Sequence, residues 1–408
     1  MSRVPRIRFK GFEEDWEQRK VGTICSISTG KSNTQDRVED GKYPFYVRSP
    51  IVECSNRYLF DEEAVLTVGD GVGTGKVFHY VDGKYDLHQR VYRMFDFGKD
   101  ITAKYFFYYF SNNFYNRVIA MTAKTSVDSV RYEMIAGMDI CTPSIKEQKF
   151  VSELFESLDH LITLHQRKLE KLKIIKKSML ENLFPKNGEK TPRIRFSGFT
   201  EDWEQRKLGE IFIYLRNNTL SREELNDEYG VAQSIHYGDV LIKYGECLNV
   251  SNELLPFINQ QYVADKFKKF YIQNGDIIIA DTAEDETAGK CTEISGIVNQ
   301  NIISGLHTIP LRPVNKFANG YLGFYLNSNS YHKQLKPLMQ GIKVTSISKN
   351  SLKTTVLEYP SGINEQQKIG TCFQSLDHLI TLHQLEPYYL IFKAIAYRII
   401  DYAEYKFF

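Results

Sequence analysis

Two segments of this chain occur twice, and this repetition constrains the fold more than any other feature. The segment PRIRFKGFEEDWEQRK, residues 5–20, returns as PRIRFSGFTEDWEQRK at residues 192–207, with 14 of 16 positions identical. The segment FESLDHLITLHQ, residues 155–166, returns at residues 373–384 with one difference, Glu156 against Gln374. Repetition of this quality indicates two copies of one structural unit.

The inserts between the repeated segments differ in sequence and in length. The first segments are offset by 187 residues and the second by 218, so the second insert is 31 residues longer. Two near-identical frames around dissimilar inserts indicate that the frames perform one task twice, such as holding identical partners. The inserts then recognise different things. A chain of 408 residues is long enough for two to four domains.

The first frame also predicts a long helix. From Glu147 to Phe184 apolar residues recur at every third or fourth position, and Pro185 ends the pattern. Such a helix would be about 57 Å long, as in a coil or spacer. If a pseudo-two-fold axis relates the repeats, the two helices run antiparallel. The expected coiled-coil or subunit interface consists of Leu154, Leu158, Leu161, Leu164, Leu172, Leu376, Leu379 and Leu382. The alternative is two unrelated buried helices.

The inserts are predicted to be mixed α/β units. Residues 64–68, AVLTV, form a strand candidate, followed by a glycine-rich turn at 69–76 and a return strand from Val77. In the second insert GDIIIA at 275–280 leads to AGK at 288–290. The expected fold class is α+β, with two α/β domains separated by long antiparallel coiled-coil helices.

Charge and cysteine content exclude several classes of protein. The net charge of +2 does not by itself mark a nucleic-acid binder, but residues 166–186 carry seven basic side chains against two acidic ones. This stretch could face phosphates, although a lysine run is more often a solvated face. The six cysteines form no C-x-x-C pair, so we expect reduced, structural thiols and no metal site. No apolar stretch is long enough for a membrane span, and we expect a cytoplasmic protein.

No motif of an enzyme is complete in this sequence. GDGVGTGK at 69–76 departs from a P-loop, since Asp70 stands where the first Gly is needed and Val77 where Ser or Thr should follow Lys76. Segments typical of adenine methyltransferases, G-x-S-x-G and H-E-x-x-H are not found. His160 and His378, which recur in SLDHL, are interpreted as polar interface residues rather than catalytic bases. We therefore expect no catalytic activity.

The doubled arrangement resembles a known family. Pro143, Glu147 and Gln148 before the first long helix, the similar Pro360, Glu365 and Gln366, and both SLDHLITLHQ segments resemble specificity subunits of type I restriction-modification systems. The resemblance implies two target-recognition domains, each reading one half of a split sequence in double-stranded DNA. It also implies helical regions that dock two methyltransferase subunits, together with restriction and translocation subunits. S-adenosylmethionine, ATP and Mg are then expected in the partner subunits and no cofactor in this chain.

The resemblance also divides the chain into regions. These are a first target-recognition domain at 1–145, a central conserved helix at 146–185, a linker at 186–191, a second target-recognition domain at 192–362 and a C-terminal conserved helix at 363–408, divergent after Gln384. Pro387 follows this point, so the second helix is predicted to end or kink there. The rival function is a coiled-coil scaffold whose inserts bind protein or another nucleic acid, and DNA selectivity would distinguish the two.

Three pairs of insert loops are candidate DNA contacts, because they carry side chains that bind phosphates and base edges. The first pair is the glycine-rich turns with Lys76 and Lys290, for which a hairpin with a solvated lysine is the alternative. In the second pair, the segment from His88 with Gln89 and Arg90 is matched with Asn299, Gln300 and Asn301, which could instead satisfy strand ends. The preferred third pair comprises Lys124, Thr125, Ser126 and Arg131, and Lys343, Thr345, Ser346 and Lys349.

Overall fold

The chain divides into two compact units in a computed structural model. The structure describes residues 5, 8–71, 73–121, 129–186, 188–341 and 343–404, with the backbone alone from Glu386 onward. The first unit comprises Met1–His165 and the segment from Glu386, and the second comprises Gln166–Leu385. Lys124, Thr125 and Ser126 lie outside the described residues.

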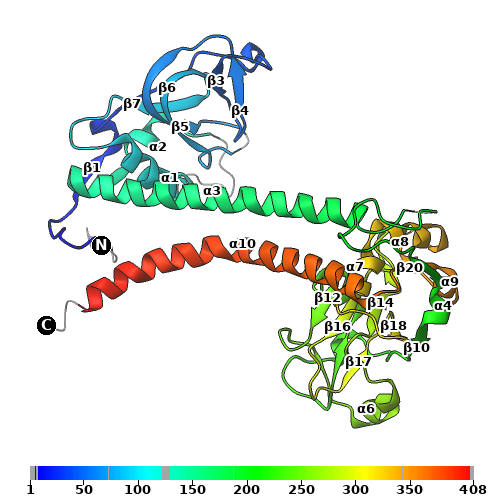
Figure 1. The fold of residues 1–408 in the computed structure, drawn as a ribbon. Coiled ribbons are helices and arrows are strands. Elements are labelled where there is room, and N and C mark those ends of the chain that lie inside the picture. Colours follow the sequence, from blue (N-terminus) through cyan, green and yellow to red (C-terminus); the bar gives the residue numbers. More distant parts are fainter. Residues whose placement is uncertain are drawn as a thin grey trace. The chain divides into compact units, whose positions relative to one another are not determined.

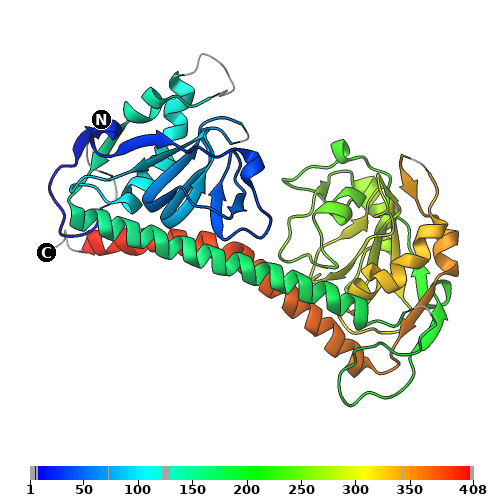
Figure 2. The ribbon, with the colours of Figure 1, turned by 90° about the horizontal axis from the view of Figure 1, so that it is seen from above.

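The first unit is a curved sheet with helices on one side (Figures 1 and 2). Its strands are β1 (Glu17–Lys20), β2 (Ser26–Thr29), β3 (Tyr43–Tyr46), β4 (Val52–Ser55), β5 (Phe60–Val68), β6 (Phe78–Leu87), β7 (Val91–Phe95) and β8 (Asp139–Thr142). Its helices are η1 (Val21–Thr23), η2 (Thr34–Asp36), α1 (Ala103–Met121), α2 (Tyr132–Ala136) and the beginning of α3 (Ile145–Asn182). Six strands form one sheet in the order β2-β7-β5-β6-β3-β4, and β1 pairs with β8.

Helix α1 links this sheet to α3. Phe106, Phe110 and Phe114 recur along α1 at a spacing of four and are fully buried, where they share a core with residues such as Val65 and Met94 of the sheet. On the side of α3, Tyr108 Oη donates a hydrogen bond of 2.9 Å to Asp159. Helix α1 therefore contacts the sheet on one side through its phenylalanines and α3 on the other through Tyr108.

The second unit has more elements than the first. Its strands are β9 (Glu204–Lys207), β10 (Phe212–Tyr214), β11 (Ala232–Ile235), β12 (Cys247–Asn249), β13 (Phe257–Ile258), β14 (Ile277–Ala280), β15 (Thr282–Ala283), β16 (Cys291–Ser295), β17 (Ile302–Ser304), β18 (Thr308–Pro313), β19 (Thr345–Ser346) and β20 (Val356–Tyr359). Its helices are α4 (Leu208–Ile211), η3 (Arg222–Glu224), α5 (Tyr237–Ile242), α6 (Gln261–Phe267), η4 (Lys268–Phe270), α7 (Tyr321–Asn327), α8 (Asn329–Leu335), η5 (Lys336–Leu338), α9 (Lys349–Thr354) and the beginning of α10 (Ile363–Glu404).

The two units share one sheet register although their inserts differ in sequence. In the first, Met94 of β7 lies between Ile27 of β2 and Val65 of β5. In the second, Leu311 of β18 lies in the same way between Tyr214 of β10 and Ile277 of β14. Strand β5 then pairs with β6, and β14 with β16, both antiparallel. The predicted strand at 64–68 and its return strand are confirmed, and its expected counterpart at 275–280 contains β14.

The strands that form one six-stranded sheet in the first unit correspond to two separate sheets in the second. Strand β6 pairs with β5 from Phe78 to Tyr85, and its last two residues, Asp86 and Leu87, pair with β3. In the second unit β16 and β17 take these two roles, and β17 pairs with β11. The difference in residue number between equivalent positions of the two units is 187 for Ile27 and Tyr214 and 212 for Val65 and Ile277. Most of the 31 extra residues of the second insert therefore lie between β10 and β14. Helices α5 and α6 are in this insertion.

The repeated segments make the same contacts in both units. Arg8 donates hydrogen bonds of 2.8 and 2.7 Å to Glu147 in α3, and Arg195 donates hydrogen bonds of 2.7 and 2.9 Å to Glu365 in α10. Both glutamates are almost fully buried. The following glutamine accepts a backbone N–H in each case, that of Thr102 for Gln148 and that of Ala318 for Gln366. We call these contacts the frame.

Parts of both long helices lie in the second unit and run antiparallel there. Lys176 in α3 forms an ion pair of 2.7 Å with Asp377 in α10, and Phe184, just after α3, stacks on Phe373 at 5.8 Å. From Lys176 to Phe184 the residue numbers rise, while those of their partners fall from Asp377 to Phe373. The two segments therefore run antiparallel here, as predicted. Helix α3 itself matches the expected span within two residues at each end.

The second long helix was predicted to end or kink at Pro387, and the prediction of an end there is wrong. Helix α10 continues from Ile363 to Glu404, as Figure 1 also shows. A proline removes one N–H and crowds one carbonyl in the preceding turn. That cost is local, and the turns on both sides keep their own hydrogen bonds, so the helical backbone passes through this position.

Candidate nucleic-acid interface

Three loops meet at one end of each sheet, and we call this place the rim. It comprises the loop after the inner strand β5 or β14, the residues before β7 or β18, and the segment before α2 or α9. In the first unit Gly69 donates its N–H to Arg90 and accepts the N–H of Val130. In the second unit Asp281 donates its N–H to His307 and accepts the N–H of Ile347. The same backbone network thus holds the rim in both units.

The glycine-lysine pair of each turn occupies an equivalent place on the rim. Gly75 donates its N–H to the last residue of β5 and Gly289 to the last residue of β14, both with positive φ. The lysines that follow have different partners. Lys76 is exposed and lies 4.5 Å from the ring centre of Tyr115, whereas Lys290 Nζ donates a hydrogen bond of 2.6 Å to the carbonyl of Leu241. Lys76 is therefore the better placed of the two for a phosphate contact.

The first rim is positively charged. Asp70 lies between two guanidinium groups, 3.5 Å from Arg48 and 3.7 Å from Arg90, and forms a β-bridge with Ser129. Gln89 donates a hydrogen bond of 2.6 Å to Asn33. Arg131 is exposed at the start of α2. One carboxylate cannot neutralise two guanidinium groups, so this rim presents a net positive charge to solvent.

The second rim contains the predicted segment before α9. Thr345 and Ser346 form β19, which pairs with β15 directly after β14. The hydroxyl of Thr345 donates to the carbonyl of Ala283 at 3.3 Å, so this side chain stabilises the hairpin. Lys343 and Lys349 are exposed beside it. Thr345 and Ser346 thus lie on the second rim beside the end of β14.

The predicted match between residues 88–90 and Asn299–Asn301 is wrong. Register pairs Val91 with Val68 and Thr308 with Ala280, so the counterparts of residues 88–90 are residues 305–307. Asn299, Gln300 and Asn301 lie instead in the break between β16 and β17, beside Asn274 before β14 begins. The rim follows the other end of β14. The side-chain oxygen Oε1 of Gln300 accepts the N–H of Val298 at 2.8 Å, which shapes this loop.

Sequence reasoning missed two rim residues, Asp281 and His307, and two residues that contact the rim, Arg48 and Tyr237. His307 has a φ of 52°, which non-glycine residues adopt rarely, and its Nδ1 lies 3.4 Å from Asp281. The Tyr237 and His307 rings are 5.3 Å apart and nearly perpendicular. A histidine next to a strand carries no recognisable pattern, and only the repeated register identifies its position.

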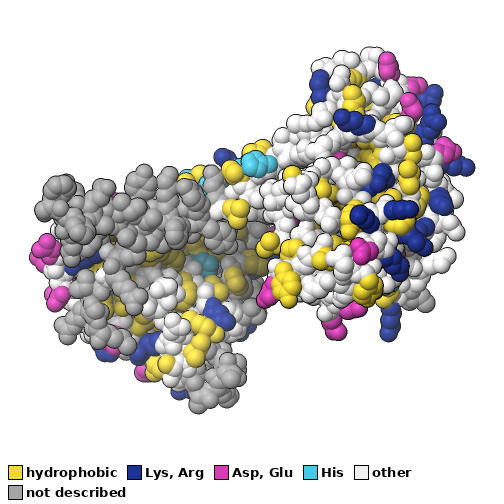
Figure 3. All heavy atoms as spheres, turned by 90° about the horizontal axis from the view of Figure 1, so that it is seen from below, with side chains coloured by type: hydrophobic (Ala, Val, Ile, Leu, Met, Phe, Trp, Pro, Cys, Tyr) yellow, Lys and Arg dark blue, Asp and Glu magenta, His cyan; other side chains and the backbone are white. Residues whose placement is uncertain are grey.

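A second basic surface lies on the insertion of the second unit. Lys and Arg side chains gather on the face of this unit that Figure 3 shows. Lys266, Lys268 and Lys269 of α6 and η4 are all exposed, and Arg216 lies 5.8 Å from the ring centre of Phe270 beside them. This cluster belongs to the extra residues of the second insert. A surface present in one unit alone does not explain a task performed by both.

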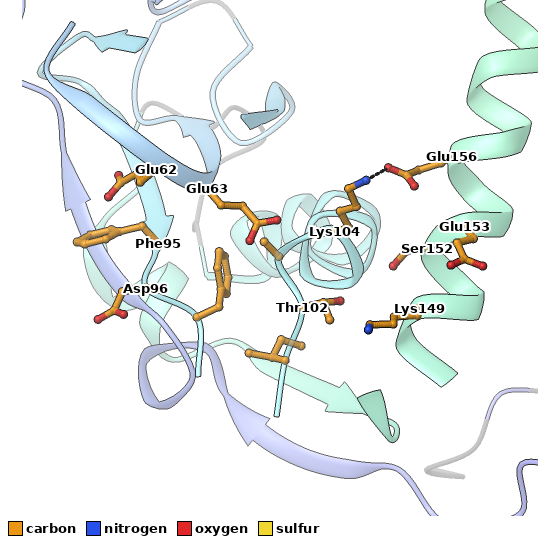
Figure 4. A pocket seen from close by; sticks show the side chains of 13 residues that line it. Glu62, Glu63, Phe95, Asp96, Thr102, Lys104, Lys149, Ser152, Glu153 and Glu156 are labelled. Atoms are coloured by element: carbon orange, nitrogen blue, oxygen red, sulfur yellow. Dashed lines mark ion pairs between the residues drawn. The ribbon is translucent and has the colours of Figure 1, made fainter. Parts of the chain in front are cut away.

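A cavity of about 950 Å³ in the first unit has the wrong charge for nucleic acid. It is lined by Glu62 and Glu63 of β5, Asp96, and Glu153 and Glu156 of α3 (Figure 4). Lys104 reaches across to Glu156 with an ion pair of 2.5 Å. Phosphates would be repelled here, so this cavity is no candidate for a nucleic-acid interface, and the rim stays the candidate.

The predicted interface leucines differ in exposure. Leu164, Leu379 and Leu382 are exposed by 40, 41 and 42%. Leu376 packs against the core of the second unit. Leu154, Leu158, Leu161 and Leu172 are half-buried. Exposed leucines at helical spacing leave apolar surface for a further protein contact.

The thiols have no partners that suggest chemistry. All six cysteines are free of disulfides, and burial raises the pKa of Cys25 to about 12. The Cys25 thiol therefore stays protonated at neutral pH. Within the part of the chain that the structure describes, no group of three or more His, Cys, Asp or Glu residues could hold a metal ion. No helix among the described residues is long and apolar enough to cross a membrane.

Two sheets with a common register, each with a polar rim and a repeated frame, define a class of paired recognition modules. Residues 13–174 and 200–388 both match the family described as type I restriction modification DNA specificity domain. The chain therefore belongs to this family and is a specificity subunit, whose task is DNA sequence recognition. The expected fold class and family are confirmed.

Known proteins of the same kind support this assignment. The chain is 23% identical to the type I restriction enzyme MjaVIII specificity subunit of Methanocaldococcus jannaschii, over 91% of this chain and 88% of that protein. It is 25% identical to the EcoDI specificity subunit of Escherichia coli, over 51% of this chain and 44% of that protein. The S subunit from M. genitalium has the same fold, with a TM-score of 0.60, 15% identity and coverage of 97% of this chain and 98% of that one.

Proposed function

We propose that this subunit binds a bipartite, gapped site in double-stranded DNA, with one half-site read by each rim. The observation that carries the proposal is the shared register of the two sheets combined with dissimilar rim residues. Equal backbones present a similar surface twice, and different side chains, such as Arg90 and His307 at equivalent positions, select different bases. A gap follows because the two rims belong to separate units.

The frame supports docking of two copies of one partner. Arg8 with Glu147 and Arg195 with Glu365 form the same buried contacts, and the sequences around them are nearly identical. Identical surfaces bind identical proteins, and we assign these two places to two methyltransferase subunits, with restriction and translocation subunits joining the complex. The subunit itself is proposed to be non-catalytic, and S-adenosylmethionine, ATP and Mg are assigned to the partners.

Purification of the subunit with its methyltransferase partner tests this assembly. Native mass spectrometry should give two methyltransferase subunits for each copy of this chain. Binding assays with duplexes of different sequence should then show selectivity for one split site over the same bases with an altered gap. A complex without DNA selectivity would instead favour a scaffold that binds other partners.

A further inference from the structure

Arg90 and His307 occupy equivalent positions on the two rims. Each is the last residue before a strand, β7 or β18, that lies next to the inner strand of its sheet. The carbonyl of Arg90 accepts the N–H of Gly69 at 2.8 Å, and the carbonyl of His307 accepts the N–H of Asp281 at 3.1 Å. Gly69 and Asp281 are themselves equivalent, because each follows the last residue of the inner strand. The match is therefore set by backbone pairing and does not depend on sequence similarity.

Each of the two basic side chains is held by a carboxylate from the loop after the inner strand. Arg90 Nε lies 3.7 Å from Asp70, and His307 Nδ1 lies 3.4 Å from Asp281. The side chains of Arg90 and His307 are 65 and 48% exposed. Exposed ion pairs contribute little to stability. Stability alone thus gives no reason for this pairing to occur in both units.

The surroundings of His307 fix the direction of its ring. Thr282 Oγ1 lies 3.5 Å from Nδ1, on the same side of the ring as Asp281, and the ring of Tyr237 stands nearly perpendicular to it. Nε2 is consequently the nitrogen on the side away from the acid. The left-handed backbone at this residue, with φ of 52°, costs conformational energy, and such positions gather at functional sites.

We propose that Arg90 and His307 are the equivalent base-reading residues of the two half-sites. The fork of Arg90 suits the O6 and N7 acceptors of a guanine in the major groove. With Nδ1–H directed at Asp281, Nε2 of the neutral imidazole of His307 is an acceptor, and it suits the amino group of an adenine (N6) or a cytosine (N4) in the major groove. Asp70 and Asp281 are positioning residues that hold the two side chains. This inference rests on the proposed function and adds to it which residue reads each half.

Methylation maps of cells that express the methyltransferase with wild-type or variant subunit test the inference. Arg90→Ala should relax at least one position in one half of the split motif, and His307→Ala at least one position in the other half. The gap and the opposite half should stay unchanged. For the bidentate contact of Arg90 the expected loss of discrimination is roughly 5- to 150-fold at the relaxed position.

Three further variants make the outcome decisive. Arg90→Lys keeps the charge but removes the fork, so it should relax the same position as Arg90→Ala while the subunit stays folded. Asp281→Asn should relax the same position as His307→Ala to a smaller extent. Lys316→Ala, an exposed lysine beyond the opposite end of β18, is the control and should leave the motif intact. An intact motif in both Arg90 and His307 variants would overturn the inference, whereas the absence of any split motif with the wild type would overturn the proposed function.

Discussion

Arg8 and Glu147 are 139 positions apart in the sequence and form a two-pronged ion pair, with hydrogen bonds of 2.8 and 2.7 Å. The pKa of Arg8 is raised, chiefly by its hydrogen bond to Glu147. Arg195 and Glu365 repeat this pair in the second unit. In both units this ion pair joins the first repeated segment to the start of a long helix. The same contact is needed twice, which is a physical reason why this segment occurs twice.

Loss of the arginine should destabilise the protein because the glutamate is left buried without a partner. Arg195→Ala is expected to lower the free energy of unfolding by about 3 kcal/mol or more. Arg193→Ala is the control in the same segment, since its pair with Glu189 is exposed and 3.6 Å long, and its cost should stay below about 1 kcal/mol. Urea unfolding measures both. In the double variant with Glu365→Gln part of the loss should be recovered, and equal effects of the two arginine variants would contradict this account of the frame.

Two glycines with the same backbone conformation should respond differently to alanine. Gly275 and Gly289 have φ of 89° and 91°, but a Cβ at Gly289 would lie 2.5 Å from Leu335 Cδ1, whereas none is near at Gly275. Gly275→Ala should cost about 1–2 kcal/mol from the backbone alone. Gly289→Ala should cost about 1 kcal/mol more, because Leu335 is buried and cannot move freely. The excess should vanish in a Leu335→Ala background, and an excess that persists there would point to another cause.

Glu293 should make stability depend on pH. Burial raises the pKa of this carboxyl to about 7, although it accepts hydrogen bonds from the N–H groups of Gly320 and Gly323. The folded protein therefore binds a proton more tightly than the unfolded chain between about pH 4.5 and 7. Stability from this group is fully present below that window and is lost as pH rises through it, by about 3 kcal/mol. The Glu293→Gln side chain stays neutral at every pH. The unfolding free energy of this variant minus that of the wild type should therefore be larger at pH 8 than at pH 5, by about this amount. A constant difference would refute the shift.

The rim and the insertion surface can be separated by their response to salt. In the rim variant, Arg48, Lys76 and Arg90 are all replaced by Gln. This variant should weaken DNA binding by the methyltransferase complex at least about 10-fold. The plot of log K against log salt should also become less steep, by about 2 to 3. The variant with Lys266, Lys268 and Lys269 all replaced by Gln also removes three charges and should change both quantities little. A larger effect of the second variant would place DNA on the face of α6.

Sequence alone predicted the parts of this protein that repeat or follow a strong period. The 14 identities in the first segment, the helix from Glu147 and the strand at 64–68 depend on local patterns. The rim of the second unit was only partly predicted. Two short polar segments beside apolar runs suggested a match of Gln89 with Gln300, whereas strand pairing matches Gln89 with Leu306. Backbone pairing is decided by packing of the whole sheet, which no single segment encodes. The assignment of particular side chains to DNA stays a prediction.

Mapping of methylated bases by long-read sequencing tests the central claim most directly. The chain is co-expressed with the methyltransferase subunit in cells without other methylation, and the sequence around each modified base is aligned. Two rims on two units predict one motif made of two specific halves with a gap of fixed length. A soluble complex that methylates a continuous motif, or methylates without sequence preference, would contradict recognition by two separate domains.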